Sequence, residues 1–231
     1  MTEAPAPWPA KLTREQAKAA KQRERDFQAV LKSRGKASGW RYSRADLFKQ
    51  EGDWFFSNMP SLAWERGAWS RFTAKPMALD PLFWDIVGLP ENNDLPLSFR
   101  ATGAWVLQPE WREGIVGASE SSVVELADQT VEWSNDQVAA SHRSIDAMIA
   151  DLGSDQELRS QRRALAICLH LLKGDLDKAQ HLCRQAGDQS SLAADGGGFG
   201  TNHADGTRST FIQQALDWIA KERRKAVRLA L

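Results

Sequence analysis

Apolar and polar residues alternate with a period of two in several stretches of the first half of the chain, which predicts strands. The clearest alternation runs from Leu97 to Leu107, and a second, with mixed faces, runs from Ala68 to Leu79. Two shorter aromatic runs precede them, and the glycines between the runs predict turns. These runs are Trp40-Arg41-Tyr42 and Trp54-Phe55-Phe56. We expect an antiparallel meander of about four strands.

A short apolar helix is expected directly after Leu79, because the residue types there suit a helix start and a helix end. Asp80 is expected to cap the first turn with its carboxylate, and Pro81 suits a position where no N–H group is needed. Gly88 suits the left-handed conformation that ends a helix. The residues between them are mostly apolar, so we expect this helix to be buried against the sheet.

Hydrophobic residues recur at helical spacing before residue 40 and after residue 119, which predicts helices on both sides of the meander. The predicted fold is α+β: an antiparallel β-meander with flanking helices, followed by a helical C-terminal region. The predicted divisions are a disordered leader at 1–11, an α+β domain with the antiparallel sheet at 12–118, a helical region packed on or following the sheet at 119–187, a flexible glycine-rich loop at 188–209 and a C-terminal helix at 210–231.

The chain has 30 Lys and Arg and 30 Asp and Glu residues, so its net charge does not favour nucleic acid or membranes as partners. The charges are unevenly distributed, however. Residues 11–36 are basic, residues 120–157 are acidic, and residues 221–231 are basic again. We expect the acidic region to contact one of the basic segments, to meet a basic partner, or to be a solvated helix face.

The chain has two cysteines, Cys168 and Cys183, and both fall in predicted helices. Two cysteines in helices do not form a disulfide framework, so a reducing cytoplasm is the expected compartment. The proline- and alanine-rich start, Met1 to Ala10, lacks the apolar segment of a secretory signal. No apolar run approaches the roughly 20 residues that span a bilayer. We therefore expect a cytoplasmic location and no membrane partner.

A further pattern combines a leading helix that ends near Gly35, the two aromatic runs, and one longer run. The longer run is Lys75-Pro76-Met77-Ala78-Leu79-Asp80, continuing into Phe83-Trp84-Asp85-Ile86. On these features residues 27–107 resemble a bacterial family of uncharacterised proteins, domain of unknown function 4304. The shared features are structural and the family brings no established activity, so the resemblance implies no functional residue. It leaves the helices after residue 119 unexplained.

No pattern typical of a metal, cofactor or catalytic site is present. Neither of two mirrored pairs of cysteine and histidine can converge on a metal alone, because residues two apart on a helix point in different directions. These are Cys168, His170, His181 and Cys183, expected as buried thiols and surface imidazoles. The run Gly196–Gly200 lacks the Lys-Ser/Thr of a phosphate loop and is expected to be a linker. The sequence also lacks the Gly-x-Ser-x-Gly elbow of a serine nucleophile. From these patterns together we expect no catalytic residue, no cofactor and no metal.

One side of the predicted strand from Ala68 to Leu79 carries a set of polar and aromatic residues that is typical of binding surfaces. Its members are Trp69, Arg71, Thr73 and Lys75. Trp and Arg are enriched among residues that dominate protein interfaces, and they also stack on and neutralise single-stranded nucleic acid. Asp85 is expected to face Arg71 or Lys75, most often as a structural ion pair. The set is expected to be a covered face, an open binding surface or part of a cleft.

These patterns lead to three hypotheses of function. The first is a non-catalytic protein-binding module, one version of which is an immunity-like or toxin-neutralising role. The second is an enzyme with an unrecognised site near Asp85, Arg71 and Lys75, which requires the three groups to converge in a pocket. The third is nucleic-acid binding through the basic N-terminal helix and the C-terminal tail, which requires one basic stripe. The sequence favours the first.

Overall fold

The structure is a computed structural model, which describes residues 12–63, 67–101, 107, 110–141, 143–153, 160–187, 200–202 and 208–229. It contains a five-stranded sheet and a two-stranded hairpin. The strands of the sheet are β1 (Arg41–Ser43), β2 (Asp46–Glu51), β3 (Trp54–Ala63), β4 (Gly67–Pro76) and β5 (Glu110–Val116). The hairpin is formed by β6 (Gly200–Asn202) and β7 (Arg208–Thr210). The expected leader at 1–11 and most of the expected loop at 188–209 lie outside the described residues.

Helices precede, interrupt and follow the strands, which confirms the α+β fold expected from the sequence. The α-helices are α1 (Arg14–Ala37), α2 (Leu79–Ile86), α3 (Val123–Ala140), α4 (Ile145–Asp151), α5 (Ser160–Leu172), α6 (Leu176–Gly187) and α7 (Phe211–Leu229). Two 3-10 helices lie between α2 and β5, namely η1 (Pro90–Asp94) and η2 (Leu97–Ala101). Within the described ranges, no helix combines the length and the apolar composition that crossing a bilayer requires.

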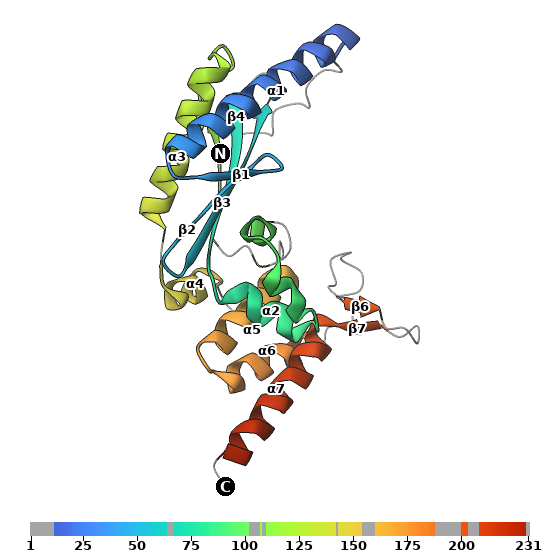
Figure 1. Ribbon diagram of the computed structural model, residues 1–231. Helices are drawn as coiled ribbons and strands as arrows, with labels where there is room; N and C mark the ends of the chain where they lie inside the picture. Colours follow the sequence, from blue (N-terminus) through green and yellow to red (C-terminus); the bar gives the residue numbers. More distant parts are fainter. Residues whose placement is uncertain are drawn as a thin grey trace, which may run out of the picture.

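The molecule is elongated, with the sheet towards one end and most of the helices towards the other (Figure 1). Helices α1 and α3 lie along the sheet, whereas α2 and α4 to α7 form a helical part below it. The strand order is β1-β2-β3-β4-β5, and every neighbouring pair is antiparallel. Because consecutive strands are neighbours, the sheet is an antiparallel meander, as the alternation predicts.

The first hydrophobic core lies between one face of the sheet and the helices α1 and α3. Its buried residues include Phe27, Leu31, Leu47, Phe56, Phe72, Val116, Leu126 and Val131. The ring of Phe72 lies 6.1 Å from that of Phe56 and 6.4 Å from that of Trp133 on α3, measured between centroids. Side chains of a strand alternate between its two faces, so this core also determines which residues of β3 and β4 point to the other side.

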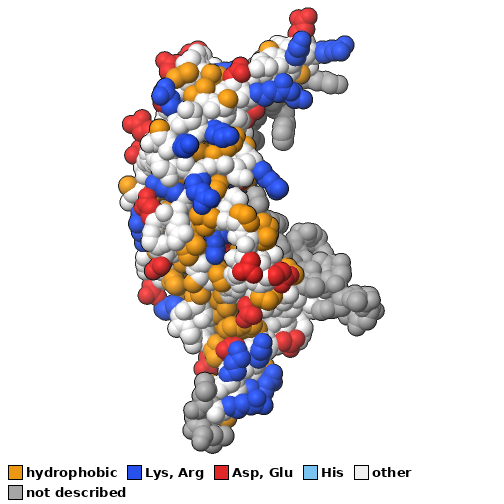
Figure 2. Space-filling model, viewed as in Figure 1, with side chains coloured by type: hydrophobic (Ala, Val, Ile, Leu, Met, Phe, Trp, Pro, Cys, Tyr) orange, Lys and Arg blue, Asp and Glu red, His pale blue; other side chains and the backbone are white. Residues whose placement is uncertain are grey.

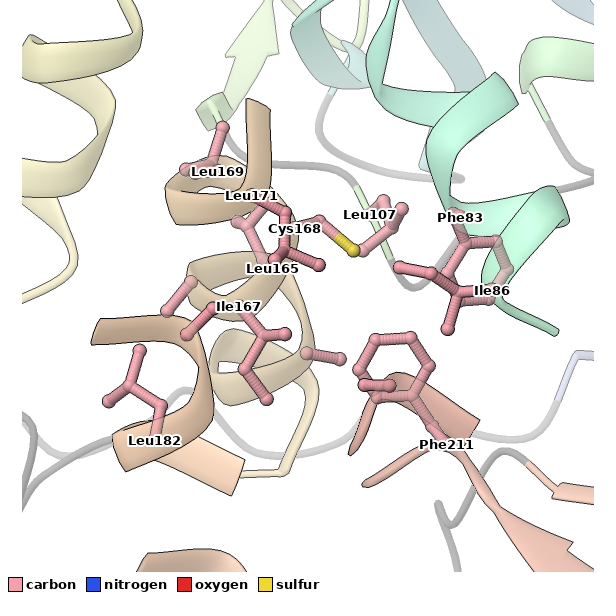
Figure 3. Packing of buried hydrophobic residues seen from close by; sticks show 14 of the residues in the cluster. Phe83, Ile86, Leu107, Leu165, Ile167, Cys168, Leu169, Leu171, Leu182 and Phe211 are labelled. Carbon is pink, nitrogen blue, oxygen red and sulfur yellow. The ribbon is translucent and has the colours of Figure 1, made fainter. Parts of the chain in front are cut away.

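The second core lies among the helices of the C-terminal part. Figure 3 shows Phe83 and Ile86 of α2 facing Phe211 of α7, with Cys168 of α5 nearby. The rings of Phe83 and Phe211 stack with centroids 5.7 Å apart. The sequence predicts burial of α2 against the sheet, but its apolar side chains pack against α5 and α7 instead. Trp54 of β3 contacts both cores and so connects them.

The strand predicted from Leu97 to Leu107 is wrong in the part that the structure describes. Residues 97–101 form the 3-10 helix η2, and residues 102–106 lie outside the described ranges. The alternating apolar residues do not share one face, because Leu97 packs against a small cluster on the sheet whereas Phe99 packs against the helical core. In the described part, the alternation therefore reflects contacts with the small cluster and with the helical core, and not the pleat of one strand.

Candidate functional site

The face of the sheet opposite α1 and α3 carries the predicted set Trp69, Arg71, Thr73 and Lys75. These side chains alternate along β4 with Ala68, Phe72 and Ala74, which belong to the first core. Trp69 and Arg71 are partly exposed, whereas Thr73 and Lys75 are buried. The structure thus divides the predicted set into an open half and a covered half.

The open half is completed by residues of the two neighbouring strands. Trp69 lies opposite Ile115 of β5, and Arg71 lies between Met59 of β3 and Glu113 of β5. Met59 is 37% exposed and Ile115 is 51% exposed, so both apolar side chains reach solvent. We call Met59, Trp69, Arg71, Glu113 and Ile115 the sheet patch.

Arg71 organises the sheet patch through two contacts. Its guanidinium carbon lies 4.9 Å from the centroid of a Trp69 ring, and its Nε donates a hydrogen bond of 3.1 Å to Glu113 Oε1. An exposed cation–π contact is worth about 0.5–1 kcal/mol, and an exposed ion pair about 0–1 kcal/mol. Together they restrict the long Arg71 side chain, and a group that is already ordered loses less entropy when a partner binds.

The covered half of the face is closed by η2 and a small hydrophobic cluster. This cluster contains Phe48 and Phe55 of the sheet and Ala101 of η2. Thr73 shares a hydrogen bond with Ser57 of β3, with 2.6 Å between the two hydroxyl oxygens. Thr73 therefore supports the sheet and is not placed to meet a partner.

Lys75 belongs to a buried ion cluster at the junction between the sheet and the helical part. Its Nζ donates to Asp80 Oδ1 over 2.8 Å and to the carbonyl oxygen of Arg100 over 2.7 Å. The Arg100 guanidinium donates to the other Asp80 oxygen over 3.3 Å and to the Met77 carbonyl over 3.0 Å. Burial lowers the pKa of Lys75 and raises the pKa of Asp80, and the attraction between the two charges opposes both shifts. The cluster joins the end of β4 to α2 and η2.

The capping role predicted for Asp80 is wrong. Ala78 occupies the N-cap of α2 and has no side-chain cap, while Asp80 is directed at Lys75 and Arg100. Leaving a buried charge unpaired costs about 3–5 kcal/mol, whereas a missing cap costs about 1 kcal/mol. The Asp80 carboxylate therefore contributes more to stability in the ion pairs than it would as a helix cap.

Asp85 does not face Arg71 or Lys75, contrary to the prediction. It is exposed, and one of its carboxylate oxygens accepts a hydrogen bond of 2.6 Å from the indole N–H of Trp218 on α7. Arg71 belongs to the sheet patch and Lys75 to the buried ion cluster. The three groups of the hypothetical catalytic site therefore have separate partners and do not converge.

The two cysteines of the helical part lie in its hydrophobic core, whereas neither histidine is among the buried residues of that core. Cys168 and Cys183 are buried free thiols, and burial raises the pKa of Cys183 to about 12. His170 is mostly buried beside an aspartate, whereas His181 is exposed. In the part of the chain that is described, no three His, Cys, Asp or Glu side chains are placed to hold a metal ion. Most of the run Gly196–Gly200 lies outside that part.

The two basic segments lie at opposite ends of the molecule, with α1 at one end and the last turns of α7 at the other (Figure 1). Helix α1 packs along α3, where Arg34 pairs with Asp128 over 3.0 Å. Arg23 also donates to the carbonyl oxygens of Ser119 and Ser121, just before α3. The acidic region thus contacts the basic N-terminal helix. The two segments therefore do not combine into one basic surface, which the hypothesis of nucleic-acid binding through both of them requires.

Three members of the sheet patch, Met59, Glu113 and Ile115, are not found by reasoning from the sequence. A signal for Met59 exists, because alternation along β3 from the core residue Phe56 places position 59 on the opposite face. Glu113 and Ile115 join the patch through the pairing of β5 with β4, and no local pattern reveals that pairing.

Comparisons with known proteins do not identify this chain: no family model, curated protein or solved structure matches it. The resemblance of residues 27–107 to the domain of unknown function 4304 family is therefore neither supported nor contradicted.

Proposed function

We propose that this protein is a non-catalytic protein-binding module whose partner docks on the sheet patch. The observation that carries the proposal is the exposure of Met59 and Ile115 beside the stacked side chains of Trp69 and Arg71. Trp and Arg supply much of the binding energy of protein interfaces when neighbouring side chains exclude water around them. Helices α1 and α3 hold the sheet from its other face, so the patch has a rigid support.

The chemistry of the sheet patch indicates the kind of partner surface. Met59, Trp69 and Ile115 offer apolar contact area, which suits a partner with an apolar centre. Arg71 and Glu113 place one positive and one negative group beside it, which suits a polar rim with both donors and acceptors. We propose a folded protein surface of this kind as the partner.

One further observation supports this reading over its catalytic rival, and another bears on the compartment. The groups of the hypothetical catalytic site around Asp85 have separate partners, which favours binding over catalysis. The free thiols of Cys168 and Cys183 suit a reducing compartment, so we propose that the module acts in the cytoplasm.

A capture experiment with matched surface variants tests the proposal. The immobilised protein is compared with the double variant Arg71→Glu/Ile115→Asp and with Val124→Asp, which changes an exposed apolar residue on α3. We expect the unchanged protein and Val124→Asp to retain the same specific protein from native lysate at physiological salt. The double variant is expected to bind that protein at least about tenfold more weakly, the equivalent of about 1.4 kcal/mol.

Circular dichroism spectra of the three proteins control for folding, since all three changed positions are at least partly exposed. Equal retention by the double variant would show that the partner docks elsewhere. Failure of the unchanged protein to retain any specific protein would contradict the proposed function itself.

A further inference from the structure

The last turns of α7 extend beyond the helical core. The buried residues Phe211, Ala215 and Ile219 recur every four positions, and the described side chains after Ile219 are not buried. Figure 1 shows this end of the helix projecting past α6. At 1.5 Å per residue, the part from Ala220 to Leu229 is about 15 Å long. This part of α7 is therefore available to something outside the core.

The projecting end is strongly basic, and Figure 2 shows Lys and Arg side chains gathered there. Its cations are Lys221, Arg223, Arg224, Lys225 and Arg228, and its single acidic residue between them is Glu222. Two of the cations have partners: Arg223 pairs with Asp177 of α6, and Lys225 pairs with Glu222.

The other three cations, Lys221, Arg224 and Arg228, form no ion pair with the residues that the structure describes. Their spacing of three and then four residues places them along one side of the helix. We call these three residues the basic stripe.

The stability of the helix does not account for the basic stripe. Cations stabilise the negative end of the helix dipole within the last turn, and Arg228 alone of the three lies there. Lys221 and Arg224 lie further from the end, and like charges at this spacing repel one another. A row of cations that forms no ion pair with the described residues produces a field that attracts an anionic partner.

We infer that the basic stripe binds the phosphate backbone of a nucleic acid. Val227, which is 61% exposed, is the one large apolar side chain between Lys221 and Arg228. A protein interface and the insertion of an amphipathic helix into a membrane need a larger apolar contact, whereas contact with phosphates is electrostatic and needs none. This activity is independent of the sheet patch, which lies in the other part of the molecule.

The dimensions of the stripe fit this partner. From Lys221 to Arg228 the helix rises about 10 Å, and successive phosphates of one DNA strand are about 3.4 Å apart along the axis. Three cations therefore correspond to about three phosphates. Such a contact carries no sequence information, because base edges are not touched.

Fluorescence anisotropy with a labelled DNA duplex, titrated with the full chain, tests the inference. Three phosphate contacts predict that the logarithm of affinity falls with the logarithm of salt concentration with a slope of about −2.7. Affinity should then drop about 40-fold between about 50 and 200 mM salt. The variant Lys221→Gln/Arg224→Gln/Arg228→Gln is expected to bind at least about tenfold more weakly at low salt and to show a flatter slope.

The matched control is Lys18→Gln/Lys21→Gln/Arg25→Gln, which removes the same charge from exposed positions of α1 at the opposite end. We expect it to bind like the unchanged protein. Absence of binding at low salt, or an equal loss in the control, would overturn the inference. Displacement of the duplex by polyglutamate, or equal binding to anionic lipid vesicles at the same charge concentration, would also overturn it, because another polyanion would then be as good a partner.

Discussion

Lys75 and Asp80 are 1% and 0% exposed, and they form an ion pair at the point where the sheet and the helical part meet. Removing ions from water costs several kcal/mol each, and the pairing recovers this only when the geometry is good. Arg100 improves that geometry by occupying the second Asp80 oxygen. We therefore expect this cluster to specify how β4, α2 and η2 meet.

Replacing one member of the cluster tests this role. Lys75→Met is expected to lower the free energy of unfolding by about 3–5 kcal/mol, because Asp80 would stay buried with one cation fewer. Arg71→Met on the same strand breaks the exposed pair with Glu113 and is expected to cost about 1 kcal/mol or less. Urea denaturation measures both variants. Similar losses for the two would contradict the special role of the buried cluster.

Asp46 makes the stability depend on pH. The residue is 5% exposed, and burial raises the pKa of its carboxyl group to about 6, compared with about 3.9 in an unfolded chain. The folded state therefore binds this proton more tightly than the unfolded chain does. The resulting contribution of Asp46 to the free energy of unfolding is complete below about pH 4 and is lost as the pH rises through about 6.

Asp46→Asn removes this titration. We expect the variant to be more stable than the unchanged protein by about 1–2 kcal/mol at pH 7.5, with the difference disappearing near pH 4. Thermal denaturation of both proteins across this pH range measures the difference. A difference that does not change with pH would contradict the role of the Asp46 carboxyl group.

Among the elements, β4 begins at a residue that has to be glycine. Gly67 has a φ of +88°, and a Cβ there would lie 2.6 Å from the carbonyl oxygens of Val116 and Gly117. Gly39 has a similar φ of +81° but open space around it. We expect Gly67→Ala to destabilise by about 2 kcal/mol or more and Gly39→Ala by about 1 kcal/mol. Equal melting temperatures for the two variants would contradict the close approach of β5 to Gly67.

The sequence predicts elements well where the cause of an element is local. Thr13 and Ser122 start α1 and α3 because each side chain accepts a hydrogen bond from its own first turn. Leu97 and Phe99 lie in η2 and not in a strand, because Leu97 packs against the small cluster on the sheet and Phe99 against the helical core. Local alternation contains no information about those contacts.

The same distinction applies to the candidate site. Alternation along β4 correctly places Trp69, Arg71, Thr73 and Lys75 on one face. Which of them stays open depends on η2, which covers the lower half of the face, and on β5, which brings Ile115 beside Trp69. Both are long-range contacts, so the sequence alone predicts the face but not the patch.

At the scale of the whole molecule, two hydrophobic cores share a junction made by the partly buried Trp54 and the buried ion cluster around Asp80. We expect the two parts to unfold together. Phe83→Ala, in the helical core, should lower stability by about 3–5 kcal/mol and still give one transition. Far-ultraviolet circular dichroism and tryptophan fluorescence should report the same midpoint. Two separate midpoints would show that the cores are independent.

The most direct test of the proposed function is a photo-crosslinking residue in place of Ile115, with the same residue in place of Val124 on α3 as the control. In cells that produce the protein, illumination is expected to yield a covalent adduct with one specific protein from position 115 and not from position 124. Adding Arg71→Glu should remove that adduct. No adduct from position 115, or the same adducts from both positions, would contradict docking on the sheet patch.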